Sequence, residues 1–289
     1  MKKVIVIAGP TAVGKTEISI KLAEYFEGEI INADASSFKK KLNIGTAKVN
    51  SSEMKSVKHH MIDIIDSLDN YSIKDFQVDG RKIIESVEVP FIVGGSGLYI
   101  NALVQDYNLE ANTRDESKFD SYDNETLYSM LMNLNSAVAN KTHPNNRRRV
   151  IRYLELVLNQ GEVVTREPIY IYDVLMITLT RDRKILYERI NNRVDNMIAS
   201  GLIDECIKLK NDGVDLSKIK DIGYSEIGLF LDGELSIDQV SDIIKQKTRN
   251  LAKRQITWFK NKTNSVFVDL DNYNINDLIS KIDLFLKND

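Results

Sequence analysis

Short apolar runs alternate with longer amphipathic segments over much of this 289-residue chain. The first run, residues 4–8, is apolar at every position, which is typical of a strand covered on both faces in a parallel sheet. Helical spacing begins at Lys15, and its inward positions are Ile18, Ile20, Leu22 and Ala23. Further strands are expected at residues 29–32, 90–94, 174–180 and 266–270. Strands that alternate with helices predict an α/β fold with a doubly wound parallel sheet.

This alternation stops between Asp106 and about Tyr170. The region begins with a polar stretch and continues with two helical patterns, at residues 124–140 and 147–160. Later helices are expected at residues 182–200, 202–212, 236–260 and 275–287. The pattern therefore predicts a core formed by residues 1–106 and 171–289, with a small helical insertion domain at residues 107–170.

Composition and charge narrow the possible classes of protein. With 43% hydrophobic and 28% charged residues, the chain is typical of a folded globular protein. The first apolar run ends at a Gly-Pro after five residues, so we interpret it as a buried strand rather than a signal peptide. No run approaches the ~20 apolar residues of a membrane span, so we expect no membrane partner.

The only cysteine, Cys206, excludes an internal disulfide and a cysteine-based metal cluster, which fits a cytoplasmic location. We expect Cys206 to pack as a small buried hydrophobe. The net charge of −3 provides no general attraction to nucleic acid, so any such contact must come from local basic clusters.

A phosphate-binding loop (P-loop) motif follows the first predicted strand. Its residues, Gly9-Pro10-Thr11-Ala12-Val13-Gly14-Lys15-Thr16, match G-x-x-x-x-G-K-[ST]. The glycines let successive N–H groups point at one anion, Lys15 supplies a cation, and the Thr16 hydroxyl can hold Mg²⁺. The motif predicts that these eight residues bind a diphosphate or a triphosphate. It leaves open which of the two binds and whether a phosphoryl group is transferred.

Asp34 follows the second predicted strand, at the edge where open α/β sheets bind ligands. An ordered series of short segments comes after it. The series is Asn43-Ile-Gly-Thr-Ala-Lys48, His59-His60-Met-Ile-Asp63, Tyr71-Ser72-x-x-Asp75-Phe76, Gly94-Gly95-Ser96-Gly97-Leu98-Tyr99, His143-Pro144-Asn145-Asn146-Arg147-Arg148-Arg149, Arg189-Ile-x-x-Arg193-Val-Asp195-x-Met197, Gly201-Leu202, Ile222-Gly223-Tyr224 and Ala252-Lys253-Arg254-Gln255-x-Thr257-Trp258-Phe259. Together with the phosphate loop, this series resembles the bacterial tRNA dimethylallyltransferase family from about residue 4 to residue 260.

The resemblance implies a reaction in which dimethylallyl diphosphate donates its prenyl group to N6 of the adenosine next to the anticodon of a tRNA. Pyrophosphate leaves and Mg²⁺ assists. The family's pattern makes Asp34 the general base, Ser96 the hydroxyl beside the target base, and Arg193 a further diphosphate contact. Since an allylic carbon leaves with cationic character, its diphosphate needs concentrated positive charge. We expect the protein to act as a monomer.

The chain departs from the family directly after Asp34. It has Ala35, Ser36 and Ser37 where members usually have Ser-Met-Gln, and residues 34–37 are those expected to hold the adenine. The insertion also looks short for the family. A divergent paralogue with weakened activity therefore stays open as an alternative.

Two basic clusters are candidates for tRNA contact. The first contains Arg148, Arg149 and Arg152 beside Arg147, and the second contains Lys245, Arg249, Lys253 and Arg254 at helical spacing. A charge cluster is often only a solvated face, but two such clusters in an acidic protein favour RNA phosphate binding. The resemblance adds Gly223 and Tyr224 to the tRNA-binding set.

Two further features are interpreted as structural. We expect Trp258 to pack in the core rather than stack on a base, because it lies beside Ile256 and Phe259. His59 and His60 could form part of a metal site with Asp63, but packing and hydrogen bonding near the pocket is the better interpretation.

Three other functions compete with the transferase. A small-molecule or nucleoside kinase would use the same loop with ATP, and an adenylate isopentenyltransferase would prenylate free AMP or ADP. Neither needs two basic helices. A non-catalytic RNA-binding module would not need Asp34, Lys15, Thr16 and Arg193 together.

Overall fold

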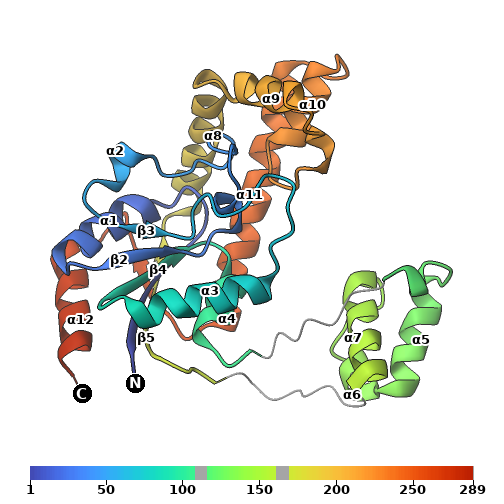
Figure 1. Cartoon of the computed structure of the whole chain (residues 1–289), viewed down its shortest axis with the longest axis horizontal. Coiled ribbons are helices and arrows are strands. Elements are labelled where there is room, and N and C mark those ends of the chain that lie inside the picture. The colour runs from blue at the N-terminus through green and yellow to red at the C-terminus, as the bar shows by residue number, and fades with distance from the viewer. Residues whose placement is uncertain (108–115, 161–168, 289) are drawn as a thin grey trace. The chain divides into compact units, whose positions relative to one another are not determined.

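The computed structural model describes residues 1–107, 116–160 and 169–288. The chain forms two compact units, one made of Met1–Tyr107 with Tyr170–Asp289 and the other of Asn108–Ile169. The first unit contains a six-stranded parallel sheet in the order β3-β2-β4-β1-β5-β6 (Figure 1). The strands are β1 (Lys3–Ala8), β2 (Glu29–Asn32), β3 (His59–His60), β4 (Pro90–Gly94), β5 (Asp173–Thr180) and β6 (Val266–Asp269).

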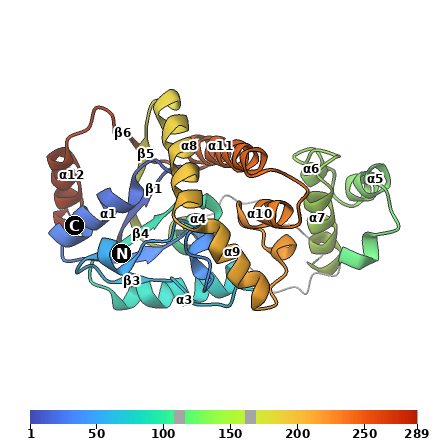
Figure 2. The same cartoon turned by 90° about the horizontal axis from the view of Figure 1, so that it is seen from above.

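Helices cover both faces of this sheet (Figure 2). The side chains of β1 alternate between the two layers. Ile5 and Ile7 pack in one core with α1 (Lys15–Tyr25), α8 (Arg183–Ala199) and α12 (Ile275–Lys287). On the other face, Val4 and Val6 share a core with the remaining layer of helices. That layer is α3 (Ile73–Ser86), α4 (Gly97–Val104) and α11 (Ile237–Lys262). The predicted doubly wound α/β fold is therefore confirmed.

The five long strands expected from the apolar runs are confirmed to within one residue at their ends. The sequence pattern did not reveal the edge strand β3, since it has only two residues and both are histidines. Helices α3, α4 and α10 (Tyr224–Leu231) were not predicted either. The signal for α3 was present in the sequence, since Ser72 and Asp75 form a capping box and Phe76, Gly80 and Ile84 are buried at a spacing of four residues. The missed α4 is almost entirely buried, and a helix that is apolar on all sides lacks the periodicity that identifies an amphipathic one.

A small helical cluster lies beyond the sheet. It combines the end of α8 with α9 (Leu202–Asn211), α10 and the first half of α11. Leu42, from the loop after β2, is fully buried among these helices, and so is Cys206, as expected. Short elements complete this unit. They are α2 (Ser51–Met54) and the 3₁₀ helices at Ala35–Phe38 and Leu216–Lys218.

The second unit has its own apolar core, formed in part by Leu127, Leu131, Val150 and Leu154. It contains a 3₁₀ turn (Glu116–Phe119), α5 (Asn124–Leu134), α6 (Ser136–Ala139) and α7 (Arg147–Gln160). The single helix expected at residues 124–140 is broken at Asn135. The side chain of that asparagine accepts a hydrogen bond from the Val138 N–H and so caps a new helix.

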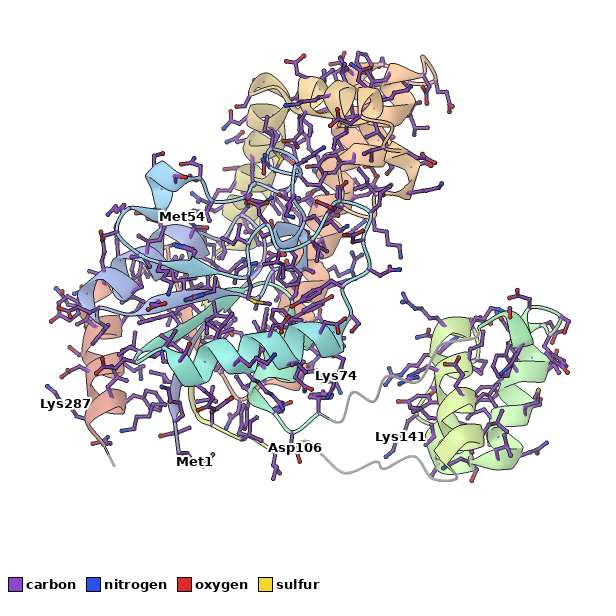
Figure 3. All side chains as sticks on the ribbon, in the orientation of Figure 1. Met1, Met54, Lys74, Asp106, Lys141 and Lys287 are labelled. Carbon is purple, nitrogen blue, oxygen red and sulfur yellow. The ribbon has the colours of Figure 1, made fainter. Side chains whose placement is uncertain are left out.

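The two chain termini emerge at the same end of the first unit, where Met1 and Lys287 are marked in Figure 3. The Lys3 ammonium donates to the Leu286 carbonyl at 3.1 Å, which ties β1 to the end of α12. None of the helices in the described part of the chain is long and apolar enough to span a membrane.

The Glu205 carboxylate of α9 anchors the loop after β2. It accepts hydrogen bonds from the backbone N–H groups of Asn43, Ile44 and Gly45 at 2.9–3.2 Å and from the Tyr224 hydroxyl at 2.7 Å. This single side chain therefore holds the loop against the helical cluster.

Replacement of this anchor should destabilise the fold. Glu205→Ala leaves several donors without their acceptor and should lower the free energy of unfolding by about 2–3 kcal/mol, measured by urea denaturation. Glu188→Ala, at an exposed position on α8, is the matched control and should stay within about 0.5 kcal/mol of the wild type. Equal effects of the two variants would contradict the anchoring role.

Candidate diphosphate and base site

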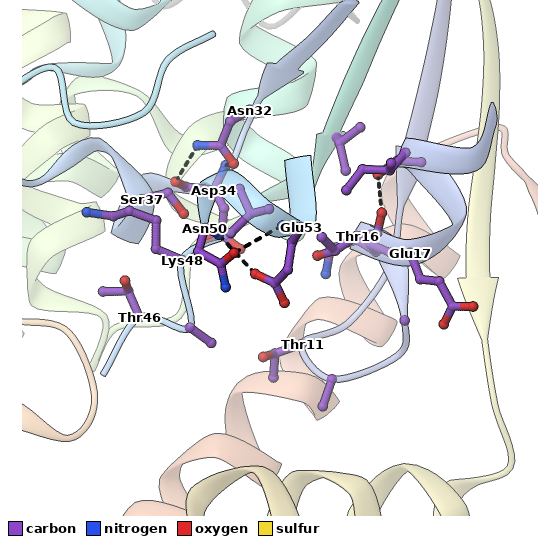
Figure 4. A pocket seen from close by; sticks show the side chains of 18 of the residues that line it. Thr11, Thr16, Glu17, Asn32, Asp34, Ser37, Thr46, Lys48, Asn50 and Glu53 are labelled. Atoms are coloured by element: carbon purple, nitrogen blue, oxygen red, sulfur yellow. Dashed lines mark hydrogen bonds between the residues drawn. The ribbon is translucent and has the colours of Figure 1, made fainter. Parts of the chain in front are cut away.

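A pocket of about 1080 Å³ opens at the carboxyl ends of the central strands (Figure 4). It brings together eight residues that the sequence analysis assigned to the site, namely Thr11, Ala12, Gly14, Lys15, Thr16, Asp34, Ser37 and Arg193. Ser96 lies outside the lining, at the N-terminal cap of α4, where its side chain makes no capping hydrogen bond. Ala35 and Ser36 also lie outside it.

The phosphate loop joins β1 to α1 and is closely supported from behind. Gly9 has a φ of +149°, and a side chain there would meet the Leu179 carbonyl oxygen at 2.7 Å, so only glycine fits. The Ala12 carbonyl accepts from Arg189 Nε at 2.9 Å, and the Val13 carbonyl accepts from Arg181 Nε at 2.9 Å. The carbonyl and the N–H of one peptide point in opposite directions. Arginines that hold the carbonyls of Ala12 and Val13 therefore also fix the directions of the N–H groups in the same peptides, as an anion-binding loop requires.

Positive charge is concentrated at this loop. The Lys15 ammonium donates to the carbonyls of Gly9 and Pro10 at 3.0 and 2.9 Å. Burial lowers the pKa of Lys15 to about 8, while the charge of Asp34 opposes that shift and Arg193 adds to it. Burial also lowers the pKa of Arg193, again opposed by Asp34. The pocket thus holds two partly desolvated cations that a diphosphate could neutralise.

Asp34 lies directly after β2 and is positioned by its own neighbourhood. Its backbone N–H donates to Asn32 Oδ1 at 3.3 Å, and Asn32 Nδ2 donates back to the Asp34 carbonyl at 3.1 Å. Asn32 Nδ2 also donates to the Met61 carbonyl at 3.0 Å, which fixes the turn relative to the next loop. The Asp34 side chain faces the pocket beside Ser37, as Figure 4 shows.

The basic clusters differ in how freely their charges are presented. Arg148 and Arg149 are exposed on α7, and Lys253 and Arg254 are exposed on α11. Arg152 lies 3.7 Å from Glu155, and Arg249 donates to Asn191 at 2.7 Å. Lys245 is paired with Asp195 at 2.6 Å. Arg147 is bound to the carbonyls of Phe119 and Tyr122, so its role is structural.

Tyr224, which the resemblance assigns to the tRNA-binding set, lies with its ring inside the protein. Tyr224 is 0% exposed, and its hydroxyl is bound to Glu205. Through Glu205 it supports the loop at Asn43–Gly45. The adjacent Gly223, at a φ of +114°, is the N-terminal cap of α10. The hydrophobicity of a tyrosine ring favours this buried position, and its burial could not be inferred from the motif alone.

His59 and His60 also have ordinary partners. His59 Nδ1 lies 2.9 Å from the Val57 carbonyl, and His60 Nε2 lies 2.5 Å from Glu29. Within the described residues, no group of three or more His, Cys, Asp and Glu side chains is arranged to hold a metal ion. The exposed Thr16 hydroxyl on the pocket wall fits a Mg²⁺ that is coordinated mainly by phosphate oxygens and water.

Sequence reasoning missed the side chains that support the phosphate loop. Arg189 is four residues before Arg193 on α8, so helical spacing could have shown that both face the loop. Arg181 had no such signal. Gln255 lies in the segment at residues 252–259 that carries the resemblance, but that segment does not show its contact with the phosphate loop. Gln255 accepts a hydrogen bond from the Thr11 N–H at 2.9 Å across a separation of 244 residues.

The fold and the site define a P-loop α/β protein whose pocket combines a phosphate-loop motif with a carboxylate. The model of the IPP transferase family matches residues 38–262. A curated relative, the tRNA dimethylallyltransferase of Halalkalibacterium halodurans, is 39% identical over 303 residues, covering 99% of this chain and 96% of the relative. The tRNA dimethylallyltransferase of Alkaliphilus metalliredigens is 40% identical over 307 residues, covering 99% and 97%. This chain therefore belongs to the IPP transferase family.

Solved structures agree with that assignment. The full-length tRNA isopentenylpyrophosphate transferase from Bacillus halodurans has a TM-score of 0.76 and 39% identity, covering 99% of this chain and 96% of that one. A eukaryotic dimethylallyltransferase, captured in crystallographic snapshots while acting on tRNA, has a TM-score of 0.87 and 27% identity, covering 99% and 80%.

The lowered pKa of Lys15 predicts a pH dependence for diphosphate binding. A bound anion favours the charged ammonium and raises its pKa, so the complex holds more protons than the free protein above pH 8. Affinity for magnesium pyrophosphate should therefore fall as the pH rises above about 8, by up to about tenfold per pH unit.

Calorimetric titrations between pH 7 and pH 10 would measure this change. Lys15→Met is the control, because the ionisation of pyrophosphate affects both proteins equally but only the wild type has the lysine. The pyrophosphate affinities of the two proteins should differ most at pH 7. Affinities that change in parallel with pH would contradict the assignment of Lys15.

Proposed function

We propose that this chain transfers the dimethylallyl group of dimethylallyl diphosphate to N6 of the adenosine next to the anticodon in tRNA, releasing pyrophosphate. The observation that carries the proposal is the placement of Asp34 in one pocket with Lys15 and Arg193. A carboxylate within the electrostatic reach of two diphosphate-binding cations suits a reaction that joins an amine to an allylic carbon.

The leaving group is the first requirement of this reaction. As the C–O bond of the donor breaks, negative charge grows on the departing diphosphate. The phosphate-loop amides, the N-terminus of α1, Lys15 and Arg193 would stabilise that charge. A bound Mg²⁺, with Thr16 as its protein ligand, would supply further positive charge. Apolar residues of the pocket wall, including Ile44, Ala47 and Met197, offer contacts to the five-carbon tail.

The nucleophile is the second requirement. The exocyclic amine of adenine is weak, because its lone pair is delocalised into the ring. As the N6–carbon bond forms, Asp34 would accept the N6 proton, with the Ser96 hydroxyl close to the target base. The adenine must leave its stack in the anticodon loop to reach this pocket. We propose that residues 34–37 receive the base there.

The exposed arginines of α7 and the exposed Lys253 and Arg254 of α11 would bind tRNA phosphates. Arg152 and Arg249 are proposed contacts as well, although each already has a protein partner. Gly223 and Tyr224 would act indirectly, by positioning the loop at Asn43–Gly45. We place this activity in the cytoplasm, where tRNA substrates occur, and expect a monomer to perform it.

Incubation of the purified protein with dimethylallyl diphosphate, Mg²⁺ and unmodified tRNA tests the function directly. Mass spectrometry of the digested tRNA should show one prenylated adenosine at the position next to the anticodon. Prenylation of AMP or ADP in preference to tRNA would favour an adenylate isopentenyltransferase. ATP consumption with phosphorylation of a small molecule would favour a kinase.

Asp34→Asn should preserve the shape of the pocket but remove the proton acceptor. General-base catalysis contributes about 10²–10⁴-fold, so single-turnover prenylation should slow by about that factor. Affinities for tRNA and pyrophosphate should change little. Asp242→Asn, at an exposed position on α11, is the control and should react like the wild type. If Asp34→Asn reacts within about threefold of the wild-type rate, the loss is far smaller than general-base catalysis requires, and the carboxylate is excluded as the base.

Charge reversal at Lys253 tests the RNA surface. Lys253→Glu should weaken tRNA binding and reduce the slope of log affinity against log salt by about one for each tRNA phosphate that the variant no longer binds. Pyrophosphate affinity should be unaffected. Lys281→Glu makes the same change of net charge at an exposed position on α12 and should leave the slope unchanged. Identical slopes for the two variants would mean that only net charge matters.

A further inference from the structure

Gln255 connects the phosphate loop to the turn after β4, a strand whose last residue, Gly94, lines the pocket. It lies on α11 and is only 9% exposed. Its Oε1 atom accepts from the Thr11 N–H at 2.9 Å, and its Nε2 atom donates to the Gly95 carbonyl at 3.0 Å. One amide thus links the phosphate loop to the turn that carries Ser96.

These two loops approach each other closely at the position of the amide. A Cβ atom on Gly95 would lie 2.4 Å from Gln255 Nε2 and 3.1 Å from the Gly9 carbonyl oxygen. That same Gly9 carbonyl accepts a hydrogen bond from Lys15. The absence of a side chain at Gly95 therefore leaves the space that the Gln255 amide needs to reach the phosphate loop.

A second residue of α11 holds the other side of the Ser96 turn. Trp258 follows Gln255 by three residues, so both lie on the same face of the helix. A Cβ atom on Gly97 would lie 2.1 Å from Trp258 Cδ1, which shows how tightly the ring is packed there. The turn before α4 is thus fixed on one side of Ser96 by a hydrogen bond and on the other by a ring.

We infer that Gln255 is a positioning residue that holds the phosphate loop and the Ser96 turn in fixed relation to each other. The inference rests on the proposed transfer reaction, in which the two loops carry the donor and the acceptor. Bond formation requires the allylic carbon and N6 at close range, and a displacement of about 1 Å can reduce a rate by about 10²-fold. Because Lys253 and Arg254 precede Gln255 on α11, the helix that would bind tRNA also aligns the two loops.

Gln255→Met removes both hydrogen bonds and keeps a side chain of similar length. With saturating substrates, kcat should fall by about 10- to 100-fold, and magnesium pyrophosphate should bind about tenfold more weakly by calorimetry. The dissociation constant for tRNA should stay within about twofold of the wild type. Gln246→Met, the same change at an exposed position on α11, should leave all three values unchanged. Normal kcat and pyrophosphate affinity in folded Gln255→Met would overturn the inference.

A second pair of variants tests whether the Gln255 amide positions the two loops or only fills the space between them. This test applies even if Gln255→Met does not fold. Gly95→Ala should displace the amide and lower kcat. In Gly95→Ala/Gln255→Ala the clash of the added methyl group with the amide is removed, and only its 3.1 Å contact with the Gly9 carbonyl oxygen remains, yet the two hydrogen bonds are absent. If Gln255 positions the loops, the double variant should remain as slow as Gln255→Ala. Recovery of wild-type kcat would show that the amide only fills space.

Thermal unfolding of each variant confirms that the assays are made on folded protein. Prenylation by the wild type, measured in parallel, distinguishes a failure of the proposed function from a failure of the positioning role of Gln255. Failure of the wild type to modify tRNA would remove the proposed function. A wild type that reacts, with Gln255→Met equal to it in kcat and pyrophosphate affinity, would remove the positioning role alone.

Discussion

The site depends on keeping cations and peptide N–H groups concentrated at one turn of the chain, against their mutual repulsion and the loss of water. The phosphate loop is therefore held from outside. Arg181 and Arg189 bind its carbonyls, Lys15 folds onto Gly9 and Pro10, and Gln255 binds Thr11. The lowered pKa values of Lys15 and Arg193 indicate the electrostatic penalty of this arrangement in the absence of an anion. An anionic ligand would relieve that penalty. Its negative charge would also favour the charged form of Lys15, which the reaction needs.

The segment after Asp34 shows how the fold supports the other substrate. Its sequence differs from the usual family pattern at Ala35, Ser36 and Ser37, but it is firmly anchored a few residues later. Leu42 is buried among the helices beyond the sheet, and Glu205 binds the backbone at Asn43–Gly45. If residues 34–37 receive the base, as proposed, substitutions at residues 35–37 can change which base is favoured without moving Asp34. The position of Asp34 is set separately, by the hydrogen bonds of Asn32.

Local sequence signals predicted the fold well where burial is regular. The run at residues 4–8 identified β1, and the spacing from Lys15 identified the buried face of α1, because both depend on periodic burial. The edge strand β3 and the buried helix α4 lack such periodicity. The phosphate loop was predictable because its chemistry needs glycine and lysine at fixed spacing. Gln255 was not predictable, since its role depends on contacts across 244 and 160 residues that no local pattern records. The burial of Tyr224 likewise became visible only in three dimensions.

The proposed reaction breaks a carbon–oxygen bond of the donor and leaves its diphosphate intact. Phosphorus-31 NMR, recorded while the protein acts on dimethylallyl diphosphate and tRNA, distinguishes this reaction from cleavage at phosphorus. We expect one pyrophosphate to be released for each adenosine prenylated, with no inorganic phosphate or phosphorylated product. Release of inorganic phosphate, or transfer of a phosphoryl group to any acceptor, would be incompatible with this chemistry.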